Sequence, residues 1–366
     1  MKKLSGGALV AMSGGVDSSV AALLSAEKGL SCIGCTMKLF RNEDIGESPE
    51  KTCCSLADAK DARAAADRIG IPFYVFNFVD TFREQVIDRF VKSYQNGETP
   101  NPCIDCNRYL KFERLLARAK GLDLKYVVTG HYAQIEIDGG SGRYILKKGA
   151  DLSKDQSYVL YAMTQEQLKS TLFPLGGLRK SRVREIAAAY GFANAKKRDS
   201  QDLCFVRNGG YADFIRQYTG EETPRGRFVD PDGKDLGEHR GIIHYTIGQR
   251  KGLNLPGAAP VYVCAVRAED NTVVVGPPQC LYAKTLVARD INLIAVDKID
   301  APMRVSARIR YNSPEEPATV WQTGPDALRV EFDSPQKAIT KGQAAVLYDG
   351  DIVVGGGTVS EVVQSL

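Results

Sequence analysis

The chain has 366 residues, a formal net charge of +4 and nine cysteines. Its length exceeds what one hydrophobic core usually supports, so we expect two or three domains. The mild charge does not by itself predict nucleic-acid binding, and the odd number of cysteines argues for reduced thiols and against a disulfide scaffold.

Targeting and membrane signals are weak in this sequence. The apolar run before Ser13 is shorter than the core of a signal peptide, which needs about 7 to 15 such residues. No segment reaches the roughly 18 apolar residues of a membrane span. We therefore expect a cytoplasmic protein without a membrane partner.

The first part of the chain alternates strand-like apolar runs with helix-like segments. This alternation predicts an α/β fold with a parallel sheet covered by helices on both faces. The strand-like runs are residues 8–12, 32–39, 73–78 and 126–129. The helix-like segments are residues 20–28, 56–69, 82–94, 110–119, 156–169 and 181–190. Ligands of such sheets bind beyond the carboxyl ends of the strands.

The loop SGGVDSS, residues 13–19, lies between the first strand and the first helix. Its glycines permit a tight turn and close approach of the backbone, while serine hydroxyls and the N–H groups of the first helical turn can bind an anion. It matches neither GxxxxGK[ST] nor GxGxxG. We predict a nucleotide phosphate as the ligand; the alternative is a loop in which Asp17 merely caps the helix. Two basic clusters, residues 179–184 and 196–198, could also meet phosphates or be solvated helix faces.

After about residue 208 the sequence becomes rich in glycine, proline and β-branched residues, which predicts an all-β remainder. We expect a small β domain followed by a β-barrel, with domain boundaries at residues 1–208, 209–282 and 283–366. Residues 226–234 are predicted to form a strand, a turn and a second strand. The other predicted strands are residues 261–268, 272–275, 304–311, 318–322, 329–332, 344–348 and 352–354.

Two cysteines are placed for chemistry. Cys106 lies in a proline-bounded loop at the expected start of a helix, where the helix dipole would lower the thiol pKa. Cys204 follows the basic residues 196–198, which would stabilise a thiolate. Cys103 shares the loop of Cys106. The remaining apolar-flanked cysteines are expected to be small buried hydrophobes: Cys32, Cys35, Cys264 and Cys280.

A metal site is the competing interpretation of the cysteines. Three close pairs occur, at residues 32 and 35, 53 and 54, and 103 and 106, and two of them have CxxC spacing. However, residues three apart on a strand point to opposite faces, and the separation of the two CxxC pairs does not fit a zinc ribbon. We expect no metal bound by these cysteines.

Three motifs together resemble the tRNA-specific 2-thiouridylase family, MnmA or TrmU, within the PP-loop ATP pyrophosphatase superfamily. They are SGGVDSS at residues 13–19, NPCIDCN at residues 101–107 and DSQDLCF at residues 199–205. The resemblance spans nearly the whole chain and implies ATP-dependent 2-thiolation of the wobble uridine of tRNA, giving AMP and pyrophosphate. The partners would be tRNA and a cysteine desulfurase or sulfur-relay protein.

The same resemblance implies residue roles. Cys106 would be the nucleophile and Cys204 the persulfide carrier, with a Cys106–Cys204 disulfide left for reduction. Asp17 is suited to holding Mg²⁺ with the ATP. The residues implied to bind ATP are Ala11, Met12, Ser13, Gly14, Gly15, Val16, Asp17, Ser18, Met37 and Gly130. The residues implied to contact tRNA are Asn101, Pro102, Cys103, Lys154, Asp155, Gln156, Arg310 and Tyr311.

One position departs from the family pattern. Cys103 stands where many members have an aspartate proposed as an acid or base, and Asp105 lies two residues further on. Cys103 is therefore either a third participating thiol or an inert loop residue. Two other functions remain open from the residues alone: a PP-loop ligase, which needs no cysteine, and a non-catalytic RNA-binding protein with a metal-stapled fold.

Overall fold

The computed structural model describes residues 5–41, 54–197, 203–206, 210–255 and 260–363. The chain divides into two units. The first comprises residues 1–86, 103–205 and 351–353, and the second comprises residues 87–102, 206–350 and 354–366. Within the described ranges, no helix is long and apolar enough to cross a membrane.

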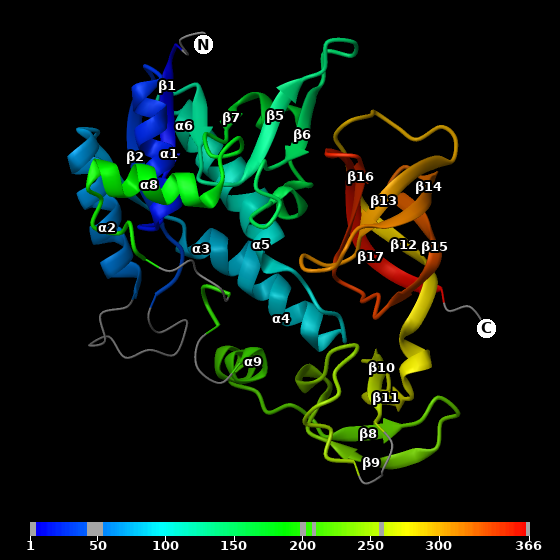
Figure 1. Cartoon of the computed structure of the whole chain (residues 1–366). Helices are drawn as coiled ribbons and strands as arrows, with labels where there is room; N and C mark the ends of the chain where they lie inside the picture. Colours follow the sequence, from blue (N-terminus) through cyan, green and yellow to red (C-terminus); the bar gives the residue numbers. More distant parts are fainter. Residues whose placement is uncertain (1–4, 42–53, 198–202, 207–209, 256–259, 364–366) are drawn as a thin grey trace. The chain divides into compact units, whose positions relative to one another are not determined.

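A parallel sheet organises the first unit (Figure 1). The strand order is β3-β2-β1-β4-β7, and neighbouring strands run parallel. The strands are β1 (Gly7–Ala11), β2 (Ser31–Lys38), β3 (Phe73–Asn77), β4 (Tyr126–Val128) and β7 (Thr171–Leu172). The predicted α/β fold is confirmed.

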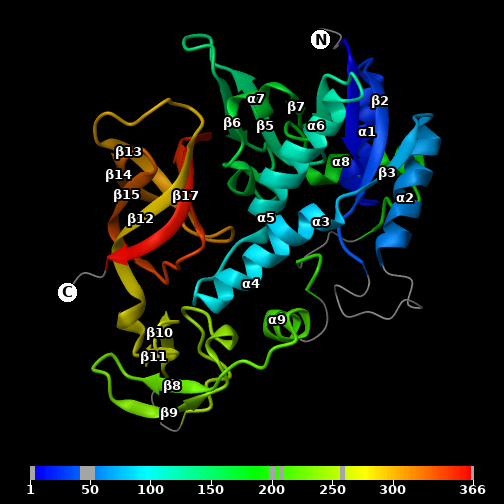
Figure 2. The same ribbon diagram turned by 180° about the vertical axis from the view of Figure 1, so that it is seen from behind.

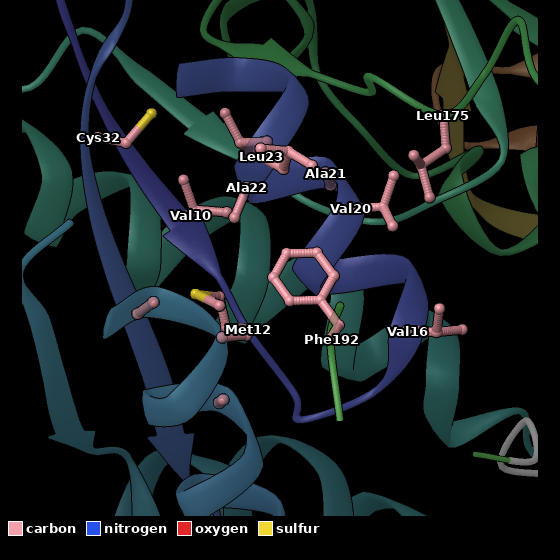
Figure 3. Close-up of a cluster of buried hydrophobic side chains, with 14 of the residues drawn as sticks. Val10, Met12, Val16, Val20, Ala21, Ala22, Leu23, Cys32, Leu175 and Phe192 are labelled. Carbon is pink, nitrogen blue, oxygen red and sulfur yellow. The ribbon is translucent and has the colours of Figure 1, made fainter. Parts of the chain in front are cut away.

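Helices cover both faces of this sheet because alternate residues of a strand point to opposite sides. On one face, Val10 of β1 and Met12, which follows the strand, pack with Val20 and Phe192 in a buried cluster (Figure 3). The helices on this face are α1 (Val16–Glu27), α2 (Cys54–Ile69) and α8 (Lys180–Tyr190). On the other face, Leu9 packs with Leu115 and Leu116 of helix α6 (Leu115–Lys120).

One helical run leads into α6 without a break. It consists of α5 (Pro102–Asp105), the π-helical segment η3 (Cys106–Arg114) and α6. An earlier run consists of α3 (Val79–Phe82), η2 (Arg83–Ile87) and α4 (Asp88–Gln95).

The segment after β4 differs from the prediction. The expected helix over residues 156–169 is two separate pieces, η4 (Ser157–Leu160) and α7 (Gln165–Lys169). The break arises because Thr164 and Gln167 form a capping box that starts α7 anew. A hairpin of β5 (Ala133–Ile137) and β6 (Tyr144–Lys148) precedes these pieces and was not among the predicted strands.

A helix occurs after residue 208, so the expectation that the rest of the chain is all-β is wrong. Helix α9 (Tyr211–Thr219) buries Phe214 against Phe90, with ring centroids 6.3 Å apart, and Tyr211 stacks on Tyr94 at 4.5 Å. A four-stranded sheet follows in the order β10-β11-β8-β9. Its strands are β8 (Gly226–Val229), β9 (Asp235–His239), β10 (Tyr262–Arg267) and β11 (Thr272–Gly276).

The last six strands close into a barrel, which confirms the predicted β-barrel (Figure 2). Strand β12 (Tyr282–Leu293) pairs antiparallel with both β15 and β17 and so joins the two ends of the sheet. The predicted strands did not include β12. The other five are β13 (Met303–Arg308), β14 (Glu316–Gly324), β15 (Ala327–Lys337), β16 (Ala344–Asp349) and β17 (Ile352–Val363).

Candidate active site

The loop between β1 and α1 is shaped by glycine. Gly14 has φ +75°, and a Cβ placed on it would lie 2.2 Å from the backbone oxygen of Asp58. Gly15 is the extended N-cap residue of α1, which has no side-chain cap. The first N–H groups of α1 therefore keep donors for a ligand, and the observed loop fits an anion such as a nucleotide phosphate.

Two serine side chains of this loop form hydrogen bonds to the loop's own backbone. The hydroxyl of Ser18 donates to the carbonyl of Gly15 at 3.0 Å and accepts from the N–H of Ser13 at 3.1 Å. The hydroxyl of Ser19 also donates to the Gly15 carbonyl, at 3.1 Å. Ser18 and Ser19 are buried, so of these three hydroxyls Ser13 alone belongs to an exposed residue.

The other two expected nucleotide contacts lie on the strands that flank β1. Met37 lies near the carboxyl end of β2, and Gly130 follows β4. A Cβ on Gly130 would lie 2.9 Å from the backbone nitrogen of Ser18, so only glycine lets this segment approach the first turn of α1. The fold thus gathers all the predicted ATP-binding residues at one edge of the sheet.

Asp17 is engaged by two side chains that the sequence reasoning did not assign. The buried Lys180 ammonium donates to both carboxylate oxygens, at 2.7 and 2.8 Å. The Tyr132 hydroxyl donates to Oδ1 at 2.7 Å. The carboxylate is therefore already paired with a cation, and in this arrangement Asp17 does not fit a metal ligand unless Lys180 moves away.

A second lysine supports the loop from the other basic cluster. Lys197 donates to the Gly14 carbonyl at 3.3 Å and to Asp58 and Asp61, each at 2.7 Å. Burial opposes its charge, but the hydrogen bonds to the two carboxylates outweigh this and raise the pKa of Lys197. Asn194 donates to the Gly14 carbonyl and to Ser19, both at 3.0 Å. Both basic clusters thus place a lysine at this loop.

The cysteine loop is helical rather than irregular. The helix begins at Pro102, so Cys106 lies one turn inside it and not at its N-terminus. The N–H of Leu115 donates to the Leu110 carbonyl, the i to i−5 bond of a π-helix. In such a segment residues five apart lie nearly above each other, which brings Lys111 to the side of the helix that carries Cys106.

Cys204 lies within electrostatic range of these residues, although it is distant in the sequence. Its neighbour Phe205 is buried and packs edge-on against Phe82, with ring centroids 5.8 Å apart. The charges of Cys106 and Cys103 act on the Cys204 thiol, and the charge of Lys111 acts on all three thiols. The three thiols and the Lys111 ammonium group are therefore close enough to influence one another electrostatically.

The expected lowering of the thiol pKa values is wrong for this structure. Cys103 and Cys204 expose part of their surface, yet nearby protein atoms desolvate the sulfurs. Burial raises the pKa of Cys106, and a smaller effect of the Lys111 ammonium lowers it. Burial, then the charges of Cys106 and Cys103, raise the pKa of Cys204 to about 12. Of the basic residues 196–198, Lys196 is exposed, Lys197 is held by two aspartates, and Arg198 lies outside the described residues.

Removing Lys111 is expected to slow alkylation of Cys106 at neutral pH. Because the ammonium lowers the thiol pKa, Lys111→Ala raises it further and shifts the pH profile of iodoacetamide labelling to higher pH. Labelling rates below the pKa change about tenfold per pH unit. The check is peptide mass spectrometry of the modified Cys106 from pH 6 to pH 10, with Lys111→Arg as the charge-retaining control. Identical profiles for Lys111→Ala and the unmodified chain would contradict this role.

The motif residues around the thiols are anchored inside the first unit. Asn107 is buried, and its amide donates to the Val159 carbonyl at 2.9 Å, which ties η3 to η4. His131 is buried, with Nδ1 2.7 Å from the Thr129 hydroxyl. Burial, followed by the Lys111 charge, holds the pKa of His131 well below its usual value. The imidazole of His131 is therefore neutral and lies within electrostatic range of the Lys111 ammonium group.

The predicted tRNA contacts differ in how available they are. The Asp155 carboxylate is buried and accepts from the N–H of Gly149 at 3.0 Å and from the Ser157 hydroxyl at 2.8 Å, so it holds its own loop. Arg310 and Tyr311 lie in the turn after β13, not within the predicted strand, and Tyr311 is exposed. Of the remaining candidates, Pro102 is buried and Cys103 is exposed. The other three are partly exposed: Asn101, Lys154 and Gln156.

The structural role expected of Cys32 and Cys35 is confirmed. Both are buried on β2, and they belong to the hydrophobic clusters on opposite faces of the sheet. Burial raises the pKa of Cys32 to about 11 and that of Cys35 to about 12. Across the described ranges, no three cysteine, histidine or acidic side chains are grouped as metal ligands. The pair at residues 53 and 54 lies outside the described side chains.

Models of protein domains match three successive stretches of the chain. They are the "tRNA methyl transferase HUP domain" over residues 7–208, the "tRNA methyl transferase PRC-barrel domain" over residues 212–277 and the "Aminomethyltransferase beta-barrel domain" over residues 283–359. The fold and the glycine loop thus define a HUP-domain protein with a PP-loop, followed by two β domains.

Comparison with curated relatives identifies the family within this class of HUP-domain proteins. The "tRNA-specific 2-thiouridylase MnmA" of Clostridioides difficile is 49% identical over 96% of this chain and 98% of its own length. MnmA 1 of Thermoanaerobacter sp. is 51% identical over 97% of this chain and 98% of its length, and MnmA of Moorella thermoacetica is 50% identical over 97% and 100%. The chain belongs to the MnmA family of tRNA-specific 2-thiouridylases.

Similarity to solved structures is much weaker. A 4-thiouridine synthetase in complex with RNA and ATP aligns with TM-score 0.38 and 16% identity over 58% of this chain and 50% of that chain. An NMN synthetase from Francisella tularensis aligns with TM-score 0.33 and 17% identity over 60% of this chain and 79% of that chain. Neither alignment contributes to the assignment.

Proposed function

We propose that this chain is a tRNA-uridine 2-sulfurtransferase that replaces the C2 oxygen of the wobble uridine with sulfur at the expense of ATP. Relatives named tRNA-specific 2-thiouridylase match nearly the full length of the chain at about half identity. The glycine loop, the cysteine helix and the segment with Cys204 all belong to the first unit.

The first chemical step is activation of the uracil. The C2 carbonyl oxygen attacks the α phosphorus of ATP, pyrophosphate leaves, and the oxygen becomes part of a good leaving group. The loop at residues 13–18 supports this role through its uncapped helix start, with Lys180 and Lys197 as nearby positive charges. The target nucleotide must be extruded from its stack to expose C2.

The second step is sulfur transfer. A donor protein leaves a persulfide on Cys204, and the Cys106 thiolate attacks the inner sulfur, which forms a Cys106–Cys204 disulfide and releases hydrosulfide. The hydrosulfide attacks C2 and AMP leaves with the former C2 oxygen. An external dithiol then reduces the disulfide. The observation that carries this proposal is the juxtaposition of the Cys204 thiol with Cys106, Cys103 and Lys111.

The wider assignments follow from the same proposal. Mg²⁺ would bind with the ATP phosphates. We do not assign Asp17 as its ligand, because the carboxylate forms an ion pair with Lys180. Asn101, Pro102 and Cys103 would face the target base, and Lys154 and Gln156 would contact tRNA nearby. Asp155 would act there only by holding the loop. Arg310 and Tyr311 would contact tRNA from the barrel.

The domain assignment and the cellular setting are also part of the proposal. Residues 1–208 would form the ATP-binding catalytic domain, residues 209–282 a central β domain and residues 283–366 the tRNA-contacting barrel. A cysteine desulfurase or sulfur-relay protein would supply the persulfide. The reaction would take place in the cytoplasm, where tRNA, ATP and reducing thiols are available.

The test is to incubate the chain with α-labelled ATP, bulk tRNA and a persulfide donor, and to assay AMP, pyrophosphate and thionucleosides. We expect AMP and 2-thiouridine in equal amounts, and no 2-thiouridine without ATP. AMP formation with a small amine or amino acid and without dependence on the cysteines would instead favour a PP-loop ligase.

Replacing Lys180 tests whether it serves the nucleotide or only Asp17. Lys180→Met removes a buried ammonium group at the start of α1, and we expect the KM for ATP to rise by at least about tenfold, or about 1.4 kcal/mol. The double variant Lys180→Met with Asp17→Asn removes both charges, so that no carboxylate is left without its cationic partner. If Lys180 serves the nucleotide, ATP binding stays weak in the double variant. Full recovery would show that the pair is only structural.

A further inference from the structure

Two thiols of the central β domain, outside the proposed active site, are brought together by an irregularity in the strand β10. Val263 pairs with Val275 and Ala265 pairs with Val274, so Cys264 is an extra residue without its own partner on β11. Such a β-bulge re-aims the side chain of the extra residue. The Cys264 thiol donates to the carbonyl of Tyr262 at 3.3 Å.

The second thiol returns to the same place through a short turn. After β11, the 3₁₀ segment η6 (Pro278–Leu281) carries Cys280, whose N–H donates to the Pro277 carbonyl at 3.1 Å. A Cβ on Gly276 would lie 3.0 Å from the Cys280 sulfur and 3.3 Å from the Cys264 sulfur. Both sulfurs therefore lie over one glycine, and a side chain at that position would displace them.

The two thiols also interact directly, and both residues are partly exposed. Burial, followed by the charge of Cys280 and a hydrogen bond with it, raises the pKa of Cys264 to about 12. Each residue is half-buried, in contrast to the fully buried Cys32 and Cys35. The expectation that Cys264 and Cys280 are simply buried hydrophobes is therefore wrong.

We propose that Cys264 and Cys280 form a reversible thiol–disulfide site that exchanges with small disulfides such as oxidised glutathione. The Cys280 thiolate attacks the glutathione disulfide, because burial disfavours the thiolate of Cys264; a mixed disulfide forms and one glutathione thiolate is released. The second cysteine attacks the protein sulfur of that mixed disulfide and releases the other glutathione. The two cysteines lose two electrons and two protons, and glutathione disulfide becomes two glutathione thiols. The new bond ties the bulge of β10 to the turn that leads into β12.

The experiment treats the full chain with oxidised glutathione, blocks free thiols and identifies cross-linked peptides by mass spectrometry. We expect a peptide pair joined through Cys264 and Cys280, and its loss after dithiothreitol. In Cys264→Ser or Cys280→Ser the remaining cysteine should carry glutathione instead. Cys32 and Cys35, buried on opposite faces, serve as an internal control and should stay reduced.

Gly276→Ala provides a second, independent measurement. The added methyl group lies in contact with both sulfurs, so we expect slower closure of the disulfide while the two single thiols still react with glutathione. Circular dichroism verifies that each variant is folded. Glutathione adducts on Cys264 or Cys280 of the unmodified chain without any linked peptide would overturn the proposal. This readout does not use thiolation activity, so it stands or falls separately from the proposed function.

Discussion

Cys204→Ser is expected to abolish 2-thiouridine formation, with a loss of at least about a thousandfold, while ATP- and tRNA-dependent release of pyrophosphate continues. A serine oxygen cannot carry the sulfane sulfur, but in the proposed mechanism the uracil is activated at the glycine loop, which this change leaves intact. Nucleoside mass spectrometry measures the first quantity and a coupled pyrophosphate assay measures the second.

Cys106→Ser is expected to block the release of sulfur from Cys204. The persulfide should accumulate on Cys204 and be visible as one added sulfur in the intact mass, because this variant lacks the thiol that is proposed to release it. Cys280→Ser is the matched control, since it removes a half-buried thiol of the central β domain; it should retain thiolation. Undiminished 2-thiouridine from Cys204→Ser would refute the proposed role of this residue.

Gly14→Ala is expected to eliminate ATP-dependent chemistry, lowering pyrophosphate release by at least about a hundredfold. A Cβ at this position would lie 2.2 Å from the Asp58 oxygen and 2.8 Å from the Asp58 carbonyl carbon, which belong to helix backbone and cannot move aside easily. The backbone φ of +75° adds strain of about 1–2 kcal/mol for a residue other than glycine. A hundredfold loss corresponds to about 2.7 kcal/mol, which collapse of the loop readily exceeds.

Two control variants separate the causes of this effect. Gly15→Ala places its Cβ in ordinary contact, 3.5 Å from the Ser13 hydroxyl, at a φ of −88° that alanine adopts freely. Gly142→Ala carries similar strain, with φ +73°, but no atom lies within 4 Å of its Cβ. Both should keep most of the activity. If Gly14→Ala matches them in activity, then the close packing of the loop on α2 is not essential.

Local sequence was sufficient to predict the nucleotide loop. A strand, two glycines and a helix start are encoded within about a dozen residues, and backbone sterics act over that range. The alternation of apolar runs predicted the parallel sheet for the same reason. The last strands were predicted by their β-branched residues, but β12 was missed because Lys284 and Arg289 interrupt its apolar pattern.

Pair interactions across the chain could not be predicted from local patterns. Lys180 stood in a basic cluster that resembled a solvated helix face, and only the packing of α8 beside α1 brings its ammonium group to Asp17. The thiol pKa values were predicted in the wrong direction because desolvation depends on atoms contributed by distant segments. The π-helical turn that aligns Lys111 with Cys106 carries no recognised sequence signal.

The sequence by itself determined the PP-loop, the two cysteine motifs and the order of an α/β domain followed by β domains. These features depend on backbone sterics and apolar periodicity, which act between residues near in sequence. Only the tertiary structure decided which charges and sulfurs meet. Asp17 is paired with Lys180, Cys204 lies beside Cys106, and a β-bulge turns Cys264 toward Cys280. Electrostatic and desolvation energies depend on distances in space, and these distances exist only once the chain has folded.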